Sequence, residues 1–199
     1  MNEEFADDQI GRYIRRIQLG LRFLGHGARA HTTCRWTGLT PDQLVTVRRR
    51  SKFNSNERLR GPSPSSFAVF FRSNRHSSQA ALFVSICQVV GATRPTRTIE
   101  NGERLCEAFE IFREWEPTSD LEFEQAVLLL DGAARAQHVE FRLCASCAGS
   151  MLIDKMGDTR NTCQNCRRNL RRLKTNSKES SSRSSSATSA NATSNTKPA

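Results

Sequence analysis

The stretch Cys144-Ala-Ser-Cys147-Ala-Gly-Ser-Met-Leu-Ile-Asp-Lys-Met-Gly-Asp-Thr-Arg-Asn-Thr-Cys163-Gln-Asn-Cys166 contains four of the seven cysteines of this 199-residue chain. Two residues separate the members of each pair, and fifteen residues separate the pairs. This spacing is typical of a tetrahedral zinc site formed by two turns. Four thiolates leave no coordination position open for a substrate. We therefore predict one structural Zn²⁺ ion, held by Cys144, Cys147, Cys163 and Cys166.

Two disulfides are the alternative interpretation of the same cysteines. Disulfides belong to oxidising compartments, but residues 1–8, Met-Asn-Glu-Glu-Phe-Ala-Asp-Asp, are acidic and lack the apolar run of a signal peptide. No stretch approaches the ~20 apolar residues that a membrane-spanning helix needs. These features favour zinc over disulfides, and we expect a cytoplasmic protein with no membrane association.

The segments beside the cysteines indicate a small zinc-ribbon-like module. Val139, Phe141 and Leu143 alternate with polar residues, as in a short strand, and Met151-Leu152-Ile153 is a candidate return strand. After the last cysteine the chain is strongly basic, which suits phosphate contacts and equally suits a frayed helix. The residues of this run that we expect to bind DNA are Arg167, Arg168, Arg171 and Arg172.

Charge is distributed unevenly along the chain. The formal net charge of +10 indicates a polyanionic partner, most simply nucleic acid. Residues 28–75 contain ten lysines and arginines against two carboxylates, whereas residues 100–124 contain nine carboxylates against two arginines. This segregation favours a basic nucleic-acid-binding surface with an acidic opposite side, although solvated helix faces are the alternative interpretation.

Residues 28–50 have the pattern of a helix-turn-helix. A first helix is expected over about 28–36, followed by a turn at Gly38. The second helix has a clear start signal, because Thr40 and Gln43 form a T-x-x-Q capping box around a proline at the first helical position. An ordinary helical hairpin with a solvated basic end is the alternative interpretation.

A recognition helix of this kind would lie in the major groove of DNA. The side chains expected to reach bases or phosphates are Asp42, Gln43, Thr46 and Arg49, and Arg48 and Arg50 are expected to neutralise phosphate.

Apolar periodicity predicts helices through most of the remaining chain. They are expected over 10–24, from about Ser77 to Val90, over 103–115 with Trp115 on the apolar stripe, and from a capping box at Ser119 to about Arg135. The segment 67–71 should anchor the preceding loop in the core. The expected fold is mainly α, with a small zinc-ribbon-like module of four cysteines at its C-terminal side. Its parts are a flexible acidic N-terminus over 1–9, a helical domain over 10–136 with the helix-turn-helix-like segment 28–50, a zinc-binding module with its basic trailer over 137–174, and a disordered Ser-rich tail over 175–199.

Several short motifs occur in an order that resembles the FlhC family, the partner chain in the FlhDC flagellar master regulator of bacteria. The resemblance covers roughly residues 10–172. It departs from the family at Phe70-Phe71, where a stretch ending in Trp-Phe is usual, and in the Ser-rich tail. The matching motifs are Ile17-Gln18-Leu19, Leu24-Gly25, Gly27-Ala28-Arg29, the Leu39-x4-Leu44 helix, Gly61-Pro62, the Phe70-Phe71 region, His76-Ser77-Ser78 and the four cysteines with their basic trailer.

This resemblance implies a mainly helical subunit that is not an enzyme, with a structural zinc held by the same four cysteines. It also implies a hetero-oligomer with an FlhD-type subunit that binds double-stranded promoter DNA and activates flagellar transcription. RNA polymerase is a further candidate partner. A zinc-ribbon RNA-binding or ribosome-associated protein is the alternative function, and a metal-dependent nuclease lacks the necessary carboxylate or histidine cluster.

Overall fold

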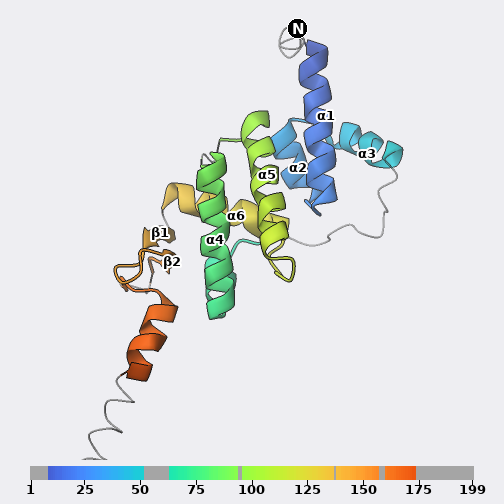
Figure 1. Cartoon of the computed structure of the whole chain (residues 1–199). Helices are drawn as coiled ribbons and strands as arrows, with labels where there is room; N and C mark the ends of the chain where they lie inside the picture. The colour runs from blue at the N-terminus through green and yellow to red at the C-terminus, as the bar shows by residue number, and fades with distance from the viewer. Residues whose placement is uncertain (1–8, 52–62, 94–95, 137, 157–159, 174–199) are drawn as a thin grey trace, which may run out of the picture.

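The computed structural model describes residues 9–51, 63–93, 96–136, 138–156 and 160–173, and these are mainly helical (Figure 1). The fold class expected from the sequence is therefore confirmed. Residues 164–173 form a further helix after the second cysteine pair. The other elements are α1 (Gln9–Gly25), α2 (Ala30–Thr37), α3 (Pro41–Arg50), η3 (Phe67–Phe71), α4 (Asn74–Val90), α5 (Ile99–Trp115), α6 (Phe123–Arg135), β1 (Val139–Leu143) and β2 (Ser150–Asp154).

Phenylalanines from four helices form the centre of the main core. Phe123 of α6 lies edge-on to Phe23 of α1, with ring centroids 4.9 Å apart, and edge-on to Phe109 of α5 at 5.1 Å. Phe83 of α4 contacts Phe112 of α5 in the same geometry at 5.7 Å. Burial of each such ring stabilises the fold by about 1.5–3 kcal/mol. This cluster fixes the helices that carry the functional segments.

The helix-turn-helix-like segment forms largely as the sequence predicts, although α2 begins at Ala30, two residues after the expected start. Gly38 adopts a left-handed conformation with φ of 69°, which ends α2 and reverses the chain without steric cost. The side chain of Thr40 accepts a hydrogen bond from the Gln43 amide, and the Gln43 side chain accepts one from the Thr40 amide. Leu39 and Leu44 are buried against Leu24 of α1. Local capping and a small apolar cluster therefore fix α3 on α1.

The helices α4 and α6 also begin at other residues than the sequence suggested. α4 begins at Asn74, three residues before the predicted Ser77, because the hydroxyl of Ser73 accepts the amide hydrogen of His76. α6 begins later than the predicted capping box at Ser119, since Glu122 caps it. The hydroxyl of Ser119 instead accepts the Leu121 amide within the preceding turn.

The helix predicted over 103–115 also differs in two respects. α5 begins at Ile99, where Thr98 accepts the amide hydrogen of Asn101. Trp115 was expected in the core but is 64% exposed, because it is the last residue of the helix and lies beyond the aromatic cluster.

The predicted hairpin is present and is joined to the helical core. β1 and β2 pair antiparallel, with Val139 opposite Asp154 and Leu143 opposite Ser150. Val139 and Leu152 belong to the main apolar cluster, whereas Met151 and Ile153 pack with the cysteines. One side of the hairpin therefore contacts the helices, and the other supports the cysteine site.

Some expectations lie outside the described residues. These are the acidic segment 1–8, most of the connector that follows α3, and the Ser-rich tail over 175–199. In the part of the chain that the structure describes, no helix has both the length and the apolar composition to cross a membrane.

Candidate metal centre and basic surfaces

The first cysteine pair lies in the turn between the two strands. The Cys144 amide donates to the carbonyl oxygen of Gly149 at 2.9 Å, and the Ala148 amide donates to the Cys144 carbonyl oxygen at 2.8 Å. Ala148 has φ of 55°, in the left-handed region that few residues other than glycine adopt. The tight turn brings Cys144 and Cys147 to the same side of the loop.

The second cysteine pair lies at the start of the helix formed by residues 164–173. The Ala145 amide donates to the carbonyl oxygen of Asn161 at 2.8 Å, which joins the two turns. The Sγ atoms of the four predicted ligands all lie within 4.8 Å of one another, and those of Cys147 and Cys163 are 3.8 Å apart. All seven cysteines of the chain are free thiols. The sequence therefore identified a side-chain cluster that could hold a metal ion.

Backbone amides favour the thiolate form of Cys144, the one fully buried member of the cluster. Its Sγ accepts hydrogen bonds from the amides of Cys163 at 3.1 Å and Ser146 at 3.4 Å. These bonds lower the pKa of Cys144 to about 6. For Cys166 the Ser146 side chain favours the thiolate, but the neighbouring sulfurs of Cys147 and Cys163 outweigh it and raise the pKa to about 12. Without a cation, the cluster therefore disfavours four negative charges together.

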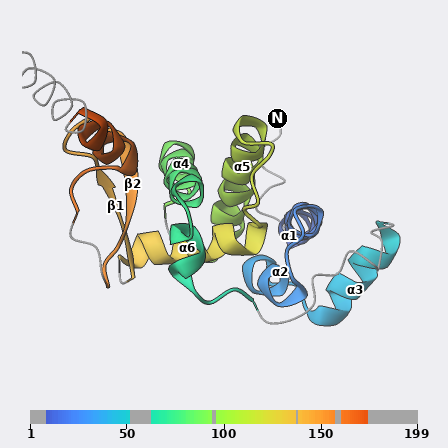
Figure 2. The same ribbon diagram turned by 90° about the horizontal axis from the view of Figure 1, so that it is seen from below.

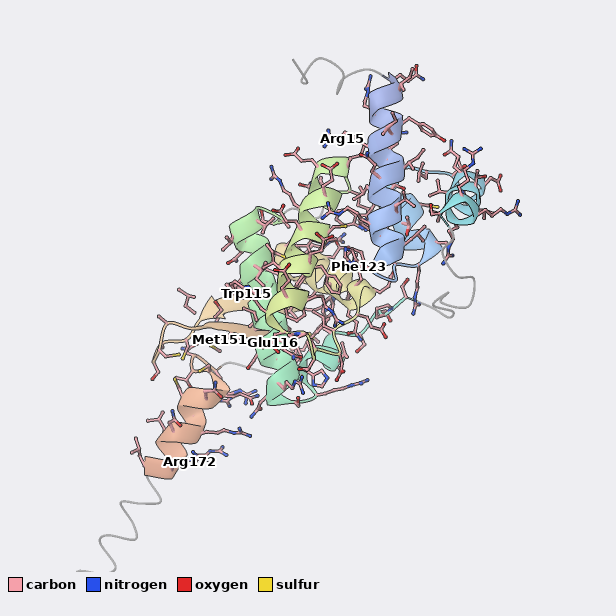
Figure 3. All side chains as sticks on the ribbon, turned by 45° about the vertical axis from the view of Figure 1, so that its right-hand side comes forward. Arg15, Trp115, Glu116, Phe123, Met151 and Arg172 are labelled. Atoms are coloured by element: carbon pink, nitrogen blue, oxygen red, sulfur yellow. The ribbon has the colours of Figure 1, made fainter. Side chains whose placement is uncertain are left out.

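The basic run after the cysteines is helical, which settles the choice between a helix and an extended trailer for residues 164–173, here called the basic helix. Arg168, Arg171 and Arg172 are exposed on it, and Arg167 is half-buried. Because Cys166 lies in its first turn, the cysteine cluster fixes the position of the arginines that follow. Figure 3 shows Arg172 at the far end of this helix.

The second predicted DNA-contacting set lies on α3. Thr46, Arg49 and Arg50 are exposed, whereas Gln43 and Arg48 are half-buried. The side-chain oxygen of Gln43 is occupied by the capping box. The exposed face of α3 is therefore polar and basic.

The two basic sets lie at opposite ends of the described structure. In Figures 1 and 2, α3 lies on the outer side of α1, and the basic helix lies beyond the hairpin on the other side of α4. The structure therefore does not bring the predicted DNA-binding residues into one compact site.

Part of the positive charge is neutralised between helices. Arg15 of α1 forms an ion pair with Glu103 of α5 at 2.6 Å, and Arg22 pairs with Glu110 at 2.7 Å. His26 lies 2.9 Å from the same Glu110 carboxylate. The acidic stretch 100–124 is thus partly an internal counter-charge to α1, and the expectation of a separate acidic side was incomplete.

Sequence reasoning missed two groups of residues. Glu124 was counted with the acidic surface but is buried at 3% exposure and binds the start of α2. A polar recess of about 340 Å³ also adjoins the basic helix, and its lining includes residues that no motif singled out. The lining residues are Asn74, Arg160, Gln164, Arg167, Arg168 and Arg171.

The fold and site together define a mainly helical protein with a four-cysteine cluster that could hold a metal ion. No family model matches the chain, and no curated protein matches it at a significant level.

Proposed function

We propose that the chain is a zinc-stabilised, DNA-binding subunit of a transcriptional activator of the FlhC type. The observation that carries the proposal is the continuity of the cysteine cluster with the basic helix. Cys163 immediately precedes this helix and Cys166 lies within it. A metal held there would fix the direction in which four arginines leave the module.

Zinc is the metal that the donor set suits best. Zinc–thiolate bonds of about 2.3 Å place the sulfurs of a regular tetrahedron about 3.8 Å apart. The Cys147 and Cys163 sulfurs have this separation, and all four sulfurs lie within 4.8 Å. Four thiolates leave no place for substrate, so the zinc would be structural. Its role would be to neutralise the sulfurs and hold the hairpin against the basic helix.

The basic side chains support a duplex partner. Arginine residues on the basic helix and on α3 can pair with phosphate through charge-assisted hydrogen bonds. Because the two sets lie on opposite sides of α4 and α1 (Figure 2), a duplex that contacted both would have to follow the length of the molecule. Each phosphate neutralised adds about −0.9 to the slope of log affinity against log salt.

The exposed face of α1 supports a partner subunit. Ile10, Tyr13 and Ile14 are 67%, 42% and 48% exposed, whereas Leu19 and Phe23 further along the helix are fully buried. The N-terminal half of α1 therefore presents apolar surface that the described residues do not cover. An FlhD-type subunit is the partner that the family resemblance suggests, in a cytoplasmic complex that would recruit RNA polymerase to flagellar promoters.

The test is co-expression with a candidate FlhD subunit, followed by size-exclusion chromatography and a promoter-DNA shift over a range of salt concentrations. We expect a stable complex that contains one zinc for each copy of the present chain and binds duplex DNA with a steep salt dependence. Failure to associate would refute the family assignment. Preferential binding of single-stranded RNA in a competition assay would instead support an RNA-binding protein.

A further inference from the structure

The recess beside the basic helix lies between the cysteine module and the helical core, because residues of both line it. Gln164, Arg167, Arg168 and Arg171 follow one another at helical spacing, so they lie along one face of the basic helix. Arg160 enters the recess from the loop before the second cysteine pair, and Asn74 enters it from the first residue of α4. In Figure 1 the lower end of α4 is the end nearest the basic helix.

Among the residues that the structure describes, the recess concentrates positive charge and is lined by no carboxylate. Four of its six lining residues are arginines, and neither of the other two is acidic. The first turn of α4 also lacks an acidic residue, so the positive end of that helix is not neutralised locally. Guanidinium groups that line one recess repel one another, and an anion between them would relieve this repulsion.

An unsatisfied donor adds a second observation. In the described part of the chain, the Nε atom of Arg167 is buried and has no hydrogen-bond partner. A buried donor without an acceptor costs about 1–3 kcal/mol. An oxygen-rich anion in the recess would accept this hydrogen and would neutralise the surrounding arginines.

We infer that the recess is a phosphate-binding site and that, when a duplex is bound, it holds one backbone phosphate. The assignment of a duplex as the source of the phosphate rests on the proposed function. Arginine provides planar, paired N–H donors that match phosphate oxygens. Gln164 and Asn74 supply amide groups that can donate without adding charge. A phosphate bound there would contact both the basic helix and the first residue of α4.

The test places a carboxylate inside the recess and compares it with the same change outside. Gln164→Glu introduces a negative charge among the arginines. Asn169→Asp introduces the same charge on the same helix, at an exposed residue that does not line the recess. Both full-length proteins are loaded with zinc, and metal content and thermal unfolding confirm that they fold. Arg171→Gln, which removes one arginine of the recess, provides a second recess variant with a smaller structural change.

Duplex affinity and its salt slope are measured for all three variants, and ³¹P line broadening reports the binding of inorganic phosphate. We expect Gln164→Glu to weaken duplex binding by about tenfold or more and to reduce the salt slope by about 0.9, the value of one phosphate contact. Asn169→Asp should change affinity by less than about threefold. Gln164→Glu should also abolish phosphate-dependent line broadening.

Equal losses of duplex affinity in Gln164→Glu and Asn169→Asp would overturn the inference, because they would indicate diffuse electrostatics instead of a site. If the wild-type chain binds no duplex but binds inorganic phosphate in a manner that Gln164→Glu abolishes, the proposed function fails and the phosphate site stands. If Gln164→Glu and Asn169→Asp bind duplex equally well and bind inorganic phosphate equally well, the site itself is refuted.

Discussion

The carboxylate of Glu124 on α6 accepts the hydroxyl hydrogen of Thr32 on α2 at 2.9 Å. Its other oxygen accepts the backbone amide hydrogen of Arg29, the residue that precedes α2, at 2.8 Å. The Arg29 side chain makes no cap of its own. A buried carboxylate more than ninety positions away in sequence therefore accepts hydrogen bonds from two donors at the start of the helix-turn-helix-like segment.

This contact predicts a large effect of a small substitution. Glu124→Gln removes the charge and turns an N–H group toward one of the two donors, so unfolding free energy should fall by about 1–3 kcal/mol. Urea denaturation measures the loss. Glu107→Gln, at an exposed residue of the neighbouring helix α5, should change stability by less than about 0.5 kcal/mol. Equal stability of the two variants would show that Glu124 does not anchor α2.

Removal of the proposed zinc ion should destabilise more than the cysteine module. Val139 and Leu152 of the hairpin lie in the main core, so loosening of the hairpin exposes apolar surface of the helical domain. Zinc at a thousandfold excess over its Kd adds about 4 kcal/mol of stability to a single-site protein. We expect chelation, or Cys144→Ser, to lower Tm and abolish bound zinc. Cys34→Ser, outside the cluster, should retain one zinc per chain. Zinc-free protein that unfolds at the same temperature as the loaded form would contradict this prediction.

Alanine substitutions at two glycines should have opposite effects on stability, because one glycine is closely packed and the other is not. A Cβ atom at Gly132 of α6 would lie 2.3 Å from a ring carbon of Phe67, whereas at Gly25 of α1 nothing lies within 4 Å. Gly132→Ala must displace Phe67 and should cost about 1–3 kcal/mol. Gly25→Ala should be neutral or should stabilise by up to about 1 kcal/mol. Thermal unfolding of the two alanine variants checks both signs, and a tolerated Gly132→Ala would contradict the packing of η3 on α6.

The turn at Ala148 offers a stabilising change. A non-glycine residue in the left-handed region costs about 1–2 kcal/mol, and glycine loses about 0.5–1 kcal/mol in chain entropy. Ala148→Gly should therefore raise the stability of the zinc-loaded protein by about 0.5–1 kcal/mol. Ala145→Gly, at a residue of the same turn without positive φ, should give no gain. A higher Tm for only the first variant would support the prediction, and a lower Tm for it would refute it.

The ion pair between Arg22 of α1 and Glu110 of α5 predicts a contribution to the free energy of unfolding that is lost in acid. Burial tends to raise the pKa of Glu110, but hydrogen bonds from Arg22 and His26 outweigh it and lower that pKa below its ordinary value of 4.5. A carboxyl with a lowered pKa in the folded state contributes its full stability above about pH 4.5, and this contribution is lost as pH falls through the lowered pKa. Because Glu110 and Arg22 are about two-fifths exposed, the contribution should be below about 1 kcal/mol.

Urea titrations of the wild type and Glu110→Gln at pH 7 and pH 3 measure this term. The difference between the two proteins should be present at pH 7 and should shrink at pH 3. Glu114→Gln, at an exposed residue of the same helix, is the control. A stability difference between wild type and Glu110→Gln that is larger at pH 3 than at pH 7 would contradict the prediction.

Features that depend on near neighbours in the chain were predictable. The T-x-x-Q box at Thr40 and Gln43 and the left-handed turn at Gly38 form as predicted, because capping and turn geometry involve residues three or four positions apart. Several serines compete as helix caps, however, and local sequence does not decide between Ser73 and Ser77 or between Ser119 and Glu122. Those starts depend on how each helix meets the core.

The sequence by itself determined the four-cysteine cluster, since two residues between ligands fix the local turn and the flanking alternation fixes the hairpin. Only the tertiary structure decided that Glu124 caps α2, that Glu103 and Glu110 neutralise α1, and that Asn74 of α4 meets the basic helix. The physical reason is that these contacts join segments far apart in the chain. Apolar periodicity predicts that a helix has a buried face, but it does not say which other helix or which polar side chain lies against it.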